Sequence, residues 1–181
     1  MCGNMKKRIQ QRAAVRGTLG SGFTIIEVIL VVVIIGIAAA VVVPMASSAG
    51  GMQLRAAVNM VAADLEYAKS MAISRGQAYS VVFNKTTETY SVVNQADTVI
   101  QHPVKKGFPY VIDFRSEGRL DRVEILDASF DATNKVTFDY LGSPYNGTPG
   151  PLNSGVVTLR SGTTTRTVSV EPVTGFISVS N

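Results

Sequence analysis

A single carboxylate stands in the longest apolar run of the sequence. Glu27 lies in the segment FTIIEVILVVVIIGIAAAVVV, residues 23–43, and no other charged residue occurs in these 21 positions. As a helix, this segment would be about 32 Å long, which is close to the hydrocarbon thickness of a bilayer, about 30 Å. An ionised group inside a membrane costs about 2.5–3.5 kcal/mol even on a lenient scale, so Glu27 indicates a function and needs a cationic partner.

The other residues that could do chemistry form no recognisable catalytic set. The one histidine, His102, lies in the loop-like context Gln-His-Pro, and no nucleophile-elbow pattern accompanies it. We interpret His102 as an exposed loop residue. The single cysteine, Cys2, excludes a disulfide within the chain and a cysteine-based zinc site. We therefore predict no enzyme activity, no catalytic residue and no cofactor.

An acidic run in the second half of the chain raises the question of calcium. The run comprises Asp121, Glu124, Asp127 and Asp131. It lacks the spacing of an EF-hand loop, and Arg119 and Arg122 interleave with the acids. A solvated polar face is the simpler interpretation, and we predict no metal site.

Positive charge is concentrated at the N-terminus. The formal net charge is +4, but the first 22 residues hold five basic and no acidic residues, whereas the remaining 159 hold 12 basic and 13 acidic residues. By the positive-inside rule, this bias keeps the N-terminus in the cytoplasm and places everything after Val43 outside it. A cleaved secretory signal is a weaker alternative, because its apolar region is normally only about 7–15 residues long.

The motif around Glu27 resembles a known processing signal. Residues 22–27, GFTIIE, follow a basic leader and open an apolar span, and this pattern is similar to the class III signal of type IV pilins and type II secretion pseudopilins. The resemblance implies that a prepilin peptidase cuts between Gly22 and Phe23 and methylates the new amine of Phe23. It also implies that Glu27 pairs with the amine of its own or a neighbouring subunit and sets the register between subunits in a filament.

The pattern after the apolar run predicts a second, amphipathic stretch of helix. Its apolar residues recur at spacings of three and four and form one stripe, which Gly76 ends: Leu54, Val58, Val61, Leu65, Ala68 and Ala72. We expect a helix that continues from the apolar run and kinks at Pro44. The alternative is that Pro44 ends the span and that residues 47–51, SSAGG, form a flexible joint.

Beyond Gly76 the pattern changes to short strands rich in valine, threonine and aromatic residues. We predict strands over 78–84, 88–93, 110–114, 122–126, 135–140, 155–160, 165–171 and 175–180, and a long exposed loop over 142–155. The expected fold class is α+β, a long hydrophobic N-terminal helix packed on a C-terminal antiparallel β-sheet domain. The expected parts are the leader 1–22, the transmembrane or filament-core helix 23–43, its amphipathic continuation 44–76 and the exported domain 77–181.

Two further segments resemble the GspH/FimT group of minor pseudopilins and pilins. They are DLEYAKSMAISRGQAYSVVF, residues 64–83, and the closing strands from FDYLGSP, residues 138–144, to TLRSGTTTRTVSVEPVTGFISV, residues 158–179. The resemblance implies a minor pseudopilin of the inner membrane, single-pass, with its C-terminal domain in the periplasm, that enters the pseudopilus of a type II secretion system. The implied partners are prepilin peptidase, other pseudopilins or pilins, the inner-membrane assembly platform and membrane lipid.

A FimT-like minor pilin of a type IV pilus, acting in pilus assembly or DNA uptake, is the alternative. Residues 44–181 hold equal numbers of basic and acidic residues, so nucleic acid is not the expected partner.

Overall fold

The computed structural model describes residues 23–180, and within α1 it describes the side chains of all residues except 41–49. The predicted leader 1–22, and with it Gly22 of the predicted cleavage site, lies outside the described residues. The chain divides into two compact units, residues 1–41 and residues 42–181. Each unit is described by itself below.

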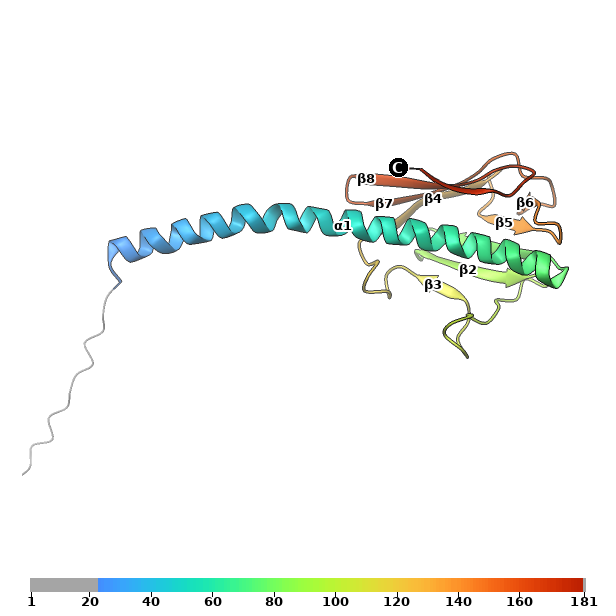
Figure 1. The fold of residues 1–181 in the computed structure, drawn as a ribbon, viewed down its shortest axis with the longest axis horizontal. Coiled ribbons are helices and arrows are strands. Elements are labelled where there is room, and N and C mark those ends of the chain that lie inside the picture. Colours follow the sequence, from blue (N-terminus) through green and yellow to red (C-terminus); the bar gives the residue numbers. More distant parts are fainter. Residues whose placement is uncertain (1–22, 181) are drawn as a thin grey trace, which may run out of the picture. The chain divides into compact units, whose positions relative to one another are not determined.

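A single helix, α1 (Ile25–Arg75), begins in the first unit and ends in the second (Figure 1). Its backbone passes Pro44 without a break, so Pro44 does not end the helix, and residues 47–51 are helical where the alternative placed a flexible joint. A kink at Pro44 stays a prediction. Within the described residues, no helix is both long enough and apolar enough to cross a membrane.

The second half of α1 carries the predicted apolar stripe. All six stripe residues, Leu54 to Ala72, are buried, and Ala57 joins them. The helix ends where Gly76 adopts a φ of 62° and the N–H of Gln77 donates to the carbonyl of Ala72 at 3.3 Å. This left-handed glycine termination confirms the predicted stop.

Two antiparallel sheets follow the helix, whereas we expected one. The first has the order β3-β2-β1-β5-β6 and the second has the order β4-β7-β8-β9 (Figure 1). The strands of the first sheet are β1 (Tyr79–Asn84), β2 (Thr89–Asn94), β3 (Val111–Asp113), β5 (Lys135–Phe138) and β6 (Pro144–Asn146). Those of the second are β4 (Glu124–Phe130), β7 (Gly155–Ser161), β8 (Thr164–Val170) and β9 (Ile177–Ser180).

Strand β6 corrects one prediction, because it lies inside the segment 142–155 that we expected to be loop. It pairs with β5 in antiparallel register, with Val136 opposite Asn146 and Phe138 opposite Pro144. Proline is tolerated here because β6 is an edge strand, where its missing N–H breaks no ladder bond.

One hydrophobic core joins the second half of α1 to both sheets. It contains the helix stripe and aromatic side chains from the strands and their connections. The ring of Phe83 on β1 lies 5.5 Å from that of Tyr90 on β2 and 5.8 Å from that of Phe130 on β4. Since β4 belongs to the second sheet, these aromatic contacts hold the two sheets together. The core confirms the α+β packing of a helix on antiparallel strands.

Candidate assembly site at the start of α1

The first turn of α1 is closed by a threonine cap. The N–H of Glu27 donates to the hydroxyl of Thr24 at 3.3 Å and to its carbonyl at 3.1 Å, and the N–H of Val28 donates to the same carbonyl at 3.2 Å. Thr24 is therefore the N-cap, and Glu27 is the third residue of the helix, the spacing of a capping box. A carboxylate at this position also interacts favourably with the helix dipole.

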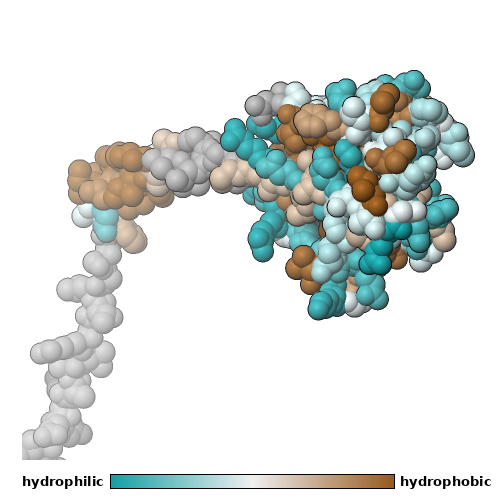
Figure 2. Space-filling view, turned by 45° about the vertical axis from the view of Figure 1, so that its right-hand side comes forward, coloured by the Kyte–Doolittle hydropathy of each residue, from teal (hydrophilic) through white to brown (hydrophobic). Residues whose placement is uncertain are grey.

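The helix that follows presents an almost entirely apolar surface. Its large side chains between Ile25 and Ile37 are each 47–82% exposed, and this stretch is mostly brown in Figure 2. A contiguous apolar surface of this kind is not stable in water and marks a membrane or protein contact. Glu27 is the one charged residue on it.

The structure brings two of the predicted site residues together. Phe23 and Glu27 line one shallow hollow of about 190 Å³ with Val28, Val31 and Val32. Residue 23, at which the predicted cleavage would begin the chain, is thus close to Glu27. Gly22 lies outside the described residues, and so does the side chain of Pro44.

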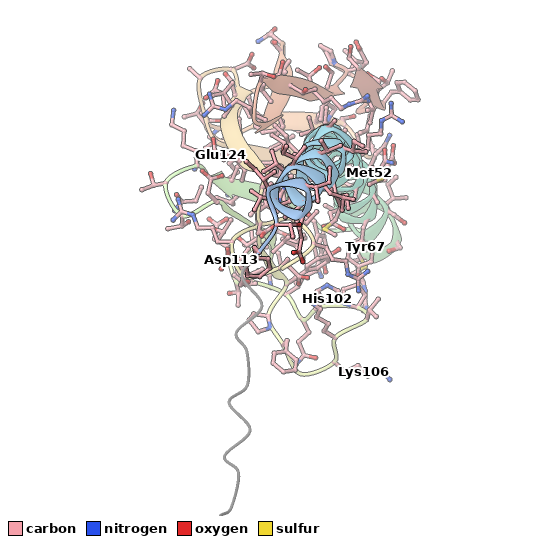
Figure 3. The ribbon with its side chains drawn as sticks, turned by 90° about the vertical axis from the view of Figure 1, so that its left-hand side faces the viewer. Met52, Tyr67, His102, Lys106, Asp113 and Glu124 are labelled. Atoms are coloured by element: carbon pink, nitrogen blue, oxygen red, sulfur yellow. The ribbon has the colours of Figure 1, made fainter. Side chains whose placement is uncertain are left out.

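His102 is half-buried, not exposed as we expected. Its Nδ1 accepts hydrogen bonds from the N–H groups of Val104 and Lys105, both at 3.1 Å, and its ring lies 4.5 Å from that of Tyr110. In Figure 3 the loop that follows His102 extends outward to Lys106. The histidine therefore shapes a loop, and its Nδ1 is occupied by backbone donors.

The residues of the acidic run do not converge on one site; they form separate ion pairs and hydrogen bonds. Glu124 pairs with Arg160 at 2.7 Å, and Asp127 pairs with Lys85 at 3.7 Å. Asp131 accepts from the N–H groups of Asn153 and Ser154, at 2.9 and 3.0 Å. Across residues 23–180 no three histidine, cysteine or acidic residues are grouped so that they could hold a metal ion.

A half-buried carboxylate on α1 fixes the first sheet to the helix. Asp64 of α1 accepts hydrogen bonds from the hydroxyls of Tyr90 and Tyr110, at 2.6 and 2.7 Å. Burial raises the pKa of Asp64 above its usual 3.8, although the two hydroxyls lower it. Burial also raises the pKa of Tyr90 and of Tyr110, and the Asp64 carboxylate adds to both shifts.

A second acid, Glu88, is buried and links the two sheets. It lies in the turn between β1 and β2 with a φ of 57°, and its carboxylate accepts the N–H of Ile125 on β4. The carbonyl of Glu88 accepts the N–H of Phe114 at 3.1 Å. Both acids are structural, and neither was identified from the sequence.

An exposed apolar helix start with one carboxylate, continuing into a helix packed on antiparallel sheets, defines a pilin-like protein. The sequence profile described as type II transport protein GspH matches residues 57–174, more than half of the chain. The chain therefore belongs to the GspH family of type II secretion pseudopilins. These are structural subunits without enzymatic activity, which confirms that the chain is not an enzyme.

Solved structures are similar in fold. The minor pseudopilin EpsH from the type 2 secretion system of Vibrio cholerae is 12% identical, with a TM-score of 0.50 over 70% of this chain and 95% of that chain. The type IV minor pilin FimU of Pseudomonas aeruginosa is 19% identical in one crystal form, with a TM-score of 0.46 over 71% of this chain and 88% of that chain. No similar protein was found among curated protein sequences.

Proposed function

We propose that this chain is a minor pseudopilin, made as a precursor in the inner membrane and assembled into the periplasmic pseudopilus of a type II secretion system. Prepilin peptidase cuts between Gly22 and Phe23 and methylates the amine of Phe23. The observation that carries the proposal is the lone carboxylate of Glu27, one helical turn from Phe23, on an exposed apolar helix of a GspH-family chain.

The apolar segment 23–43 must be shielded from water both before and after the subunit enters the filament. Before assembly, lipid covers it, and the basic leader holds the N-terminus in the cytoplasm. After assembly, the helices of neighbouring subunits replace the lipid. Lipid tails and leucine-like side chains are equally apolar, so this exchange needs a specific polar contact to favour the filament.

Glu27 supplies that polar contact. Cleavage creates a cation at Phe23, and a carboxylate in an apolar environment is stabilised when a cation pairs with it. An incoming subunit whose amine meets the Glu27 carboxylate of a subunit already in the filament is placed in register. The Thr24 cap holds the first turn of α1 helical and so keeps the carboxylate one turn from the amine.

The second unit has a mechanical role. Its helix and two sheets share one core and form the folded body that meets other pseudopilins, the assembly platform or cargo. After cleavage the mature chain contains no cysteine, so the folded domain depends on its core and on hydrogen bonds such as those of Asp64 and Glu88.

Mass spectrometry of the mature chain tests the processing step. We expect a protein that begins at N-methylated Phe23. A chain that retains the leader, or begins elsewhere, would contradict the proposal. The Glu27→Gln variant is the control, because it should be cut and methylated normally and fail only at assembly.

A further inference from the structure

The side chain of His102 closes a turn in the loop between β2 and β3. Its Nδ1 accepts the N–H groups of Val104 and Lys105, two and three residues further along the chain, both at 3.1 Å. The backbone N–H of His102 donates to the carbonyl of Phe108 at 2.9 Å. His102 therefore holds the base of the loop through its backbone and the tip, residues 103–107, through its ring (Figure 3).

The same arrangement occurs at another turn of the chain, but there an amide oxygen is the acceptor. Oδ1 of Asn84 accepts the N–H groups of Thr86 and Thr87, at 3.0 and 3.2 Å. Asparagine commonly closes turns in this way, and its amide does not titrate. At the second turn His102 takes the place of asparagine, and it brings a group whose charge depends on pH.

A protonated imidazole cannot make these two bonds. Both nitrogens of a charged histidine ring carry a hydrogen and act only as donors, so a protonated Nδ1 would face two N–H groups that also need an acceptor. The closed tip requires the neutral ring with its hydrogen on Nε2. Histidine is the residue type that changes charge between about pH 5 and pH 8, so closure is favoured above this range and disfavoured as the pH falls through it.

The groups around the ring are titratable or charged as well. They are Asp64 and Tyr67 on α1, Tyr90 on β2, Tyr110 before β3, Lys105 and Lys106 in the loop and Glu117 after β3. Burial raises the pKa of Asp64, and the charge of His102 is among the causes that lower it. The same attraction favours the protonated ring. Lys105 opposes it weakly, because Glu117 pairs with Lys105 at 2.6 Å.

We propose that His102 is a pH-sensitive latch: the neutral imidazole holds residues 103–107 closed, and the protonated imidazole releases them. The base of the loop stays closed, because the bond from the His102 N–H to Phe108 does not titrate. The released tip carries Val104, which is 82% exposed, and two lysines. Acid therefore loosens the tip and adds a positive charge beside it, so any contact made through the tip depends on pH.

Hydrogen exchange of the full-length chain in detergent micelles tests the latch. The protection factor divides the intrinsic exchange rate at each pH by the measured rate, so the pH dependence of the exchange chemistry cancels. Between about pH 8 and about pH 5.5 we expect the protection of Val104 and Lys105 to fall at least about threefold, since both amides lose their acceptor. Thr86 and Thr87 in the Asn84 turn should keep theirs. Equal protection of Val104 and Lys105 at the two pH values would overturn the proposal.

His102→Asn is the matched variant. Its Oδ1 can accept the two N–H groups as Asn84 does, and it gains no proton in this pH range. We expect Val104 and Lys105 to be protected as in the wild type at about pH 8 and to stay protected at about pH 5.5. A fall in protection as large as that of the wild type would overturn the proposal, because the imidazole would then not be its cause.

Cleavage by trypsin is a second measurement, and it needs no variant. Lys105 and Lys106 lie in the tip, whereas Arg115 lies in a turn closed by the carboxylate of Asp113, so cleavage after Arg115 corrects for the pH dependence of the protease. We expect the ratio of tip cleavage to Arg115 cleavage to rise at least about threefold between about pH 8 and about pH 5.5. An unchanged ratio would overturn the proposal. Neither measurement depends on processing or assembly, so the latch and the proposed function fail separately.

Discussion

The hydroxyl of Tyr90 on β2 donates to the carboxylate of Asp64 on α1 at 2.6 Å. Tyr90 is fully buried, so this bond is a fixed connection between the helix and the first sheet. Tyr110 donates to the same carboxylate from the segment that precedes β3. One side chain of the helix thereby holds two separate parts of the β-domain.

Removal of the Tyr90 hydroxyl tests this connection. We expect Tyr90→Phe to lower the free energy of unfolding by about 1–3 kcal/mol at neutral pH, because the half-buried carboxylate of Asp64 loses a donor. The loss should shrink as the pH falls through the pKa of Asp64, which burial raises above 3.8, since the protonated acid needs that donor less. Chemical denaturation over a pH series measures both effects.

A matched hydroxyl deletion completes that test. Tyr145 on β6 is half-buried, and Tyr145→Phe should change the free energy of unfolding much less. The role of Asp64 would be contradicted if both variants lowered the free energy of unfolding equally. It would also be contradicted if the decrease for Tyr90→Phe did not depend on pH.

Asp131 should also contribute to stability in a pH-dependent way. Hydrogen bonds from the backbone of Asn153 and Ser154 and from the side chains of Asn146 and Asn153 lower its pKa below 3.8. Its contribution is therefore present above about pH 3.8 and is lost as the pH falls through the pKa of the folded state.

The Asp131→Asn variant measures this contribution. It retains a residue that tolerates the observed φ of 51°, so it changes mainly the charge. We expect a lower thermal midpoint at pH 7 and a difference that narrows below pH 3.8. Asp127→Asn, in the same acidic run, should have a small effect throughout. A difference in thermal midpoint between wild type and Asp131→Asn that persists at low pH would contradict this role of Asp131.

Two glycines with the same backbone conformation should respond differently to alanine. Gly76 has a φ of 62° with open space around its Cα, whereas Gly175 has a φ of 58° and faces the carbonyl of Gly142. Gly76→Ala should cost about 1–2 kcal/mol of unfolding free energy, the cost of a left-handed L-residue. Gly175→Ala should cost clearly more, because backbone must move. Similar thermal midpoints for the two variants would contradict the close approach of Gly175 to Gly142.

The second unit should bind DNA only weakly. Four of its basic side chains pair with carboxylates: Lys85, Lys105, Lys135 and Arg160. An electrophoretic shift assay with the purified protein should show no retained DNA at about 150 mM salt, since the basic residues of 44–181 are matched in number by acidic residues, which repel phosphates. Submicromolar binding with a steep salt dependence would favour the alternative, a FimT-like role in DNA uptake.

The helix and most strands could be predicted from the sequence because their signals are local. The stripe from Leu54 to Ala72 has the period of a helix face, and each of the eight predicted strand segments overlaps a strand, although β4 extends four residues beyond the predicted 122–126. Strand β6 was missed because it has three residues, begins with proline and lies among glycines. The division into two sheets depends on pairings between distant segments, such as β4 with β7, and the strand pattern alone does not encode these.

The candidate site was only partly predictable for the same reason. Phe23 lies two residues before α1 and Glu27 lies in its first turn, so their spacing in the sequence predicted their proximity. Asp64 was missed, although it lies three residues after Val61 and four before Ala68, the spacing of the buried face, and this signal could have identified it. Its partners Tyr90 and Tyr110 are 26 and 46 residues away, beyond any local pattern.

The charge of Glu27 is the centre of the proposed function, and the Glu27→Gln substitution isolates it. Glutamine keeps the length and the capping ability of glutamate at the third helical position, so the start of α1 should stay intact. Thr24→Ser, which retains the cap and the charge, is the matched control.

The decisive measurement is the fraction of mature, N-methylated chain that enters the sheared pseudopilus fraction. We predict that Glu27→Gln is processed like wild type but recovered there at least tenfold less, whereas Thr24→Ser is recovered normally. Normal recovery of mature Glu27→Gln, with secretion intact, would contradict the role of Glu27 in setting subunit register.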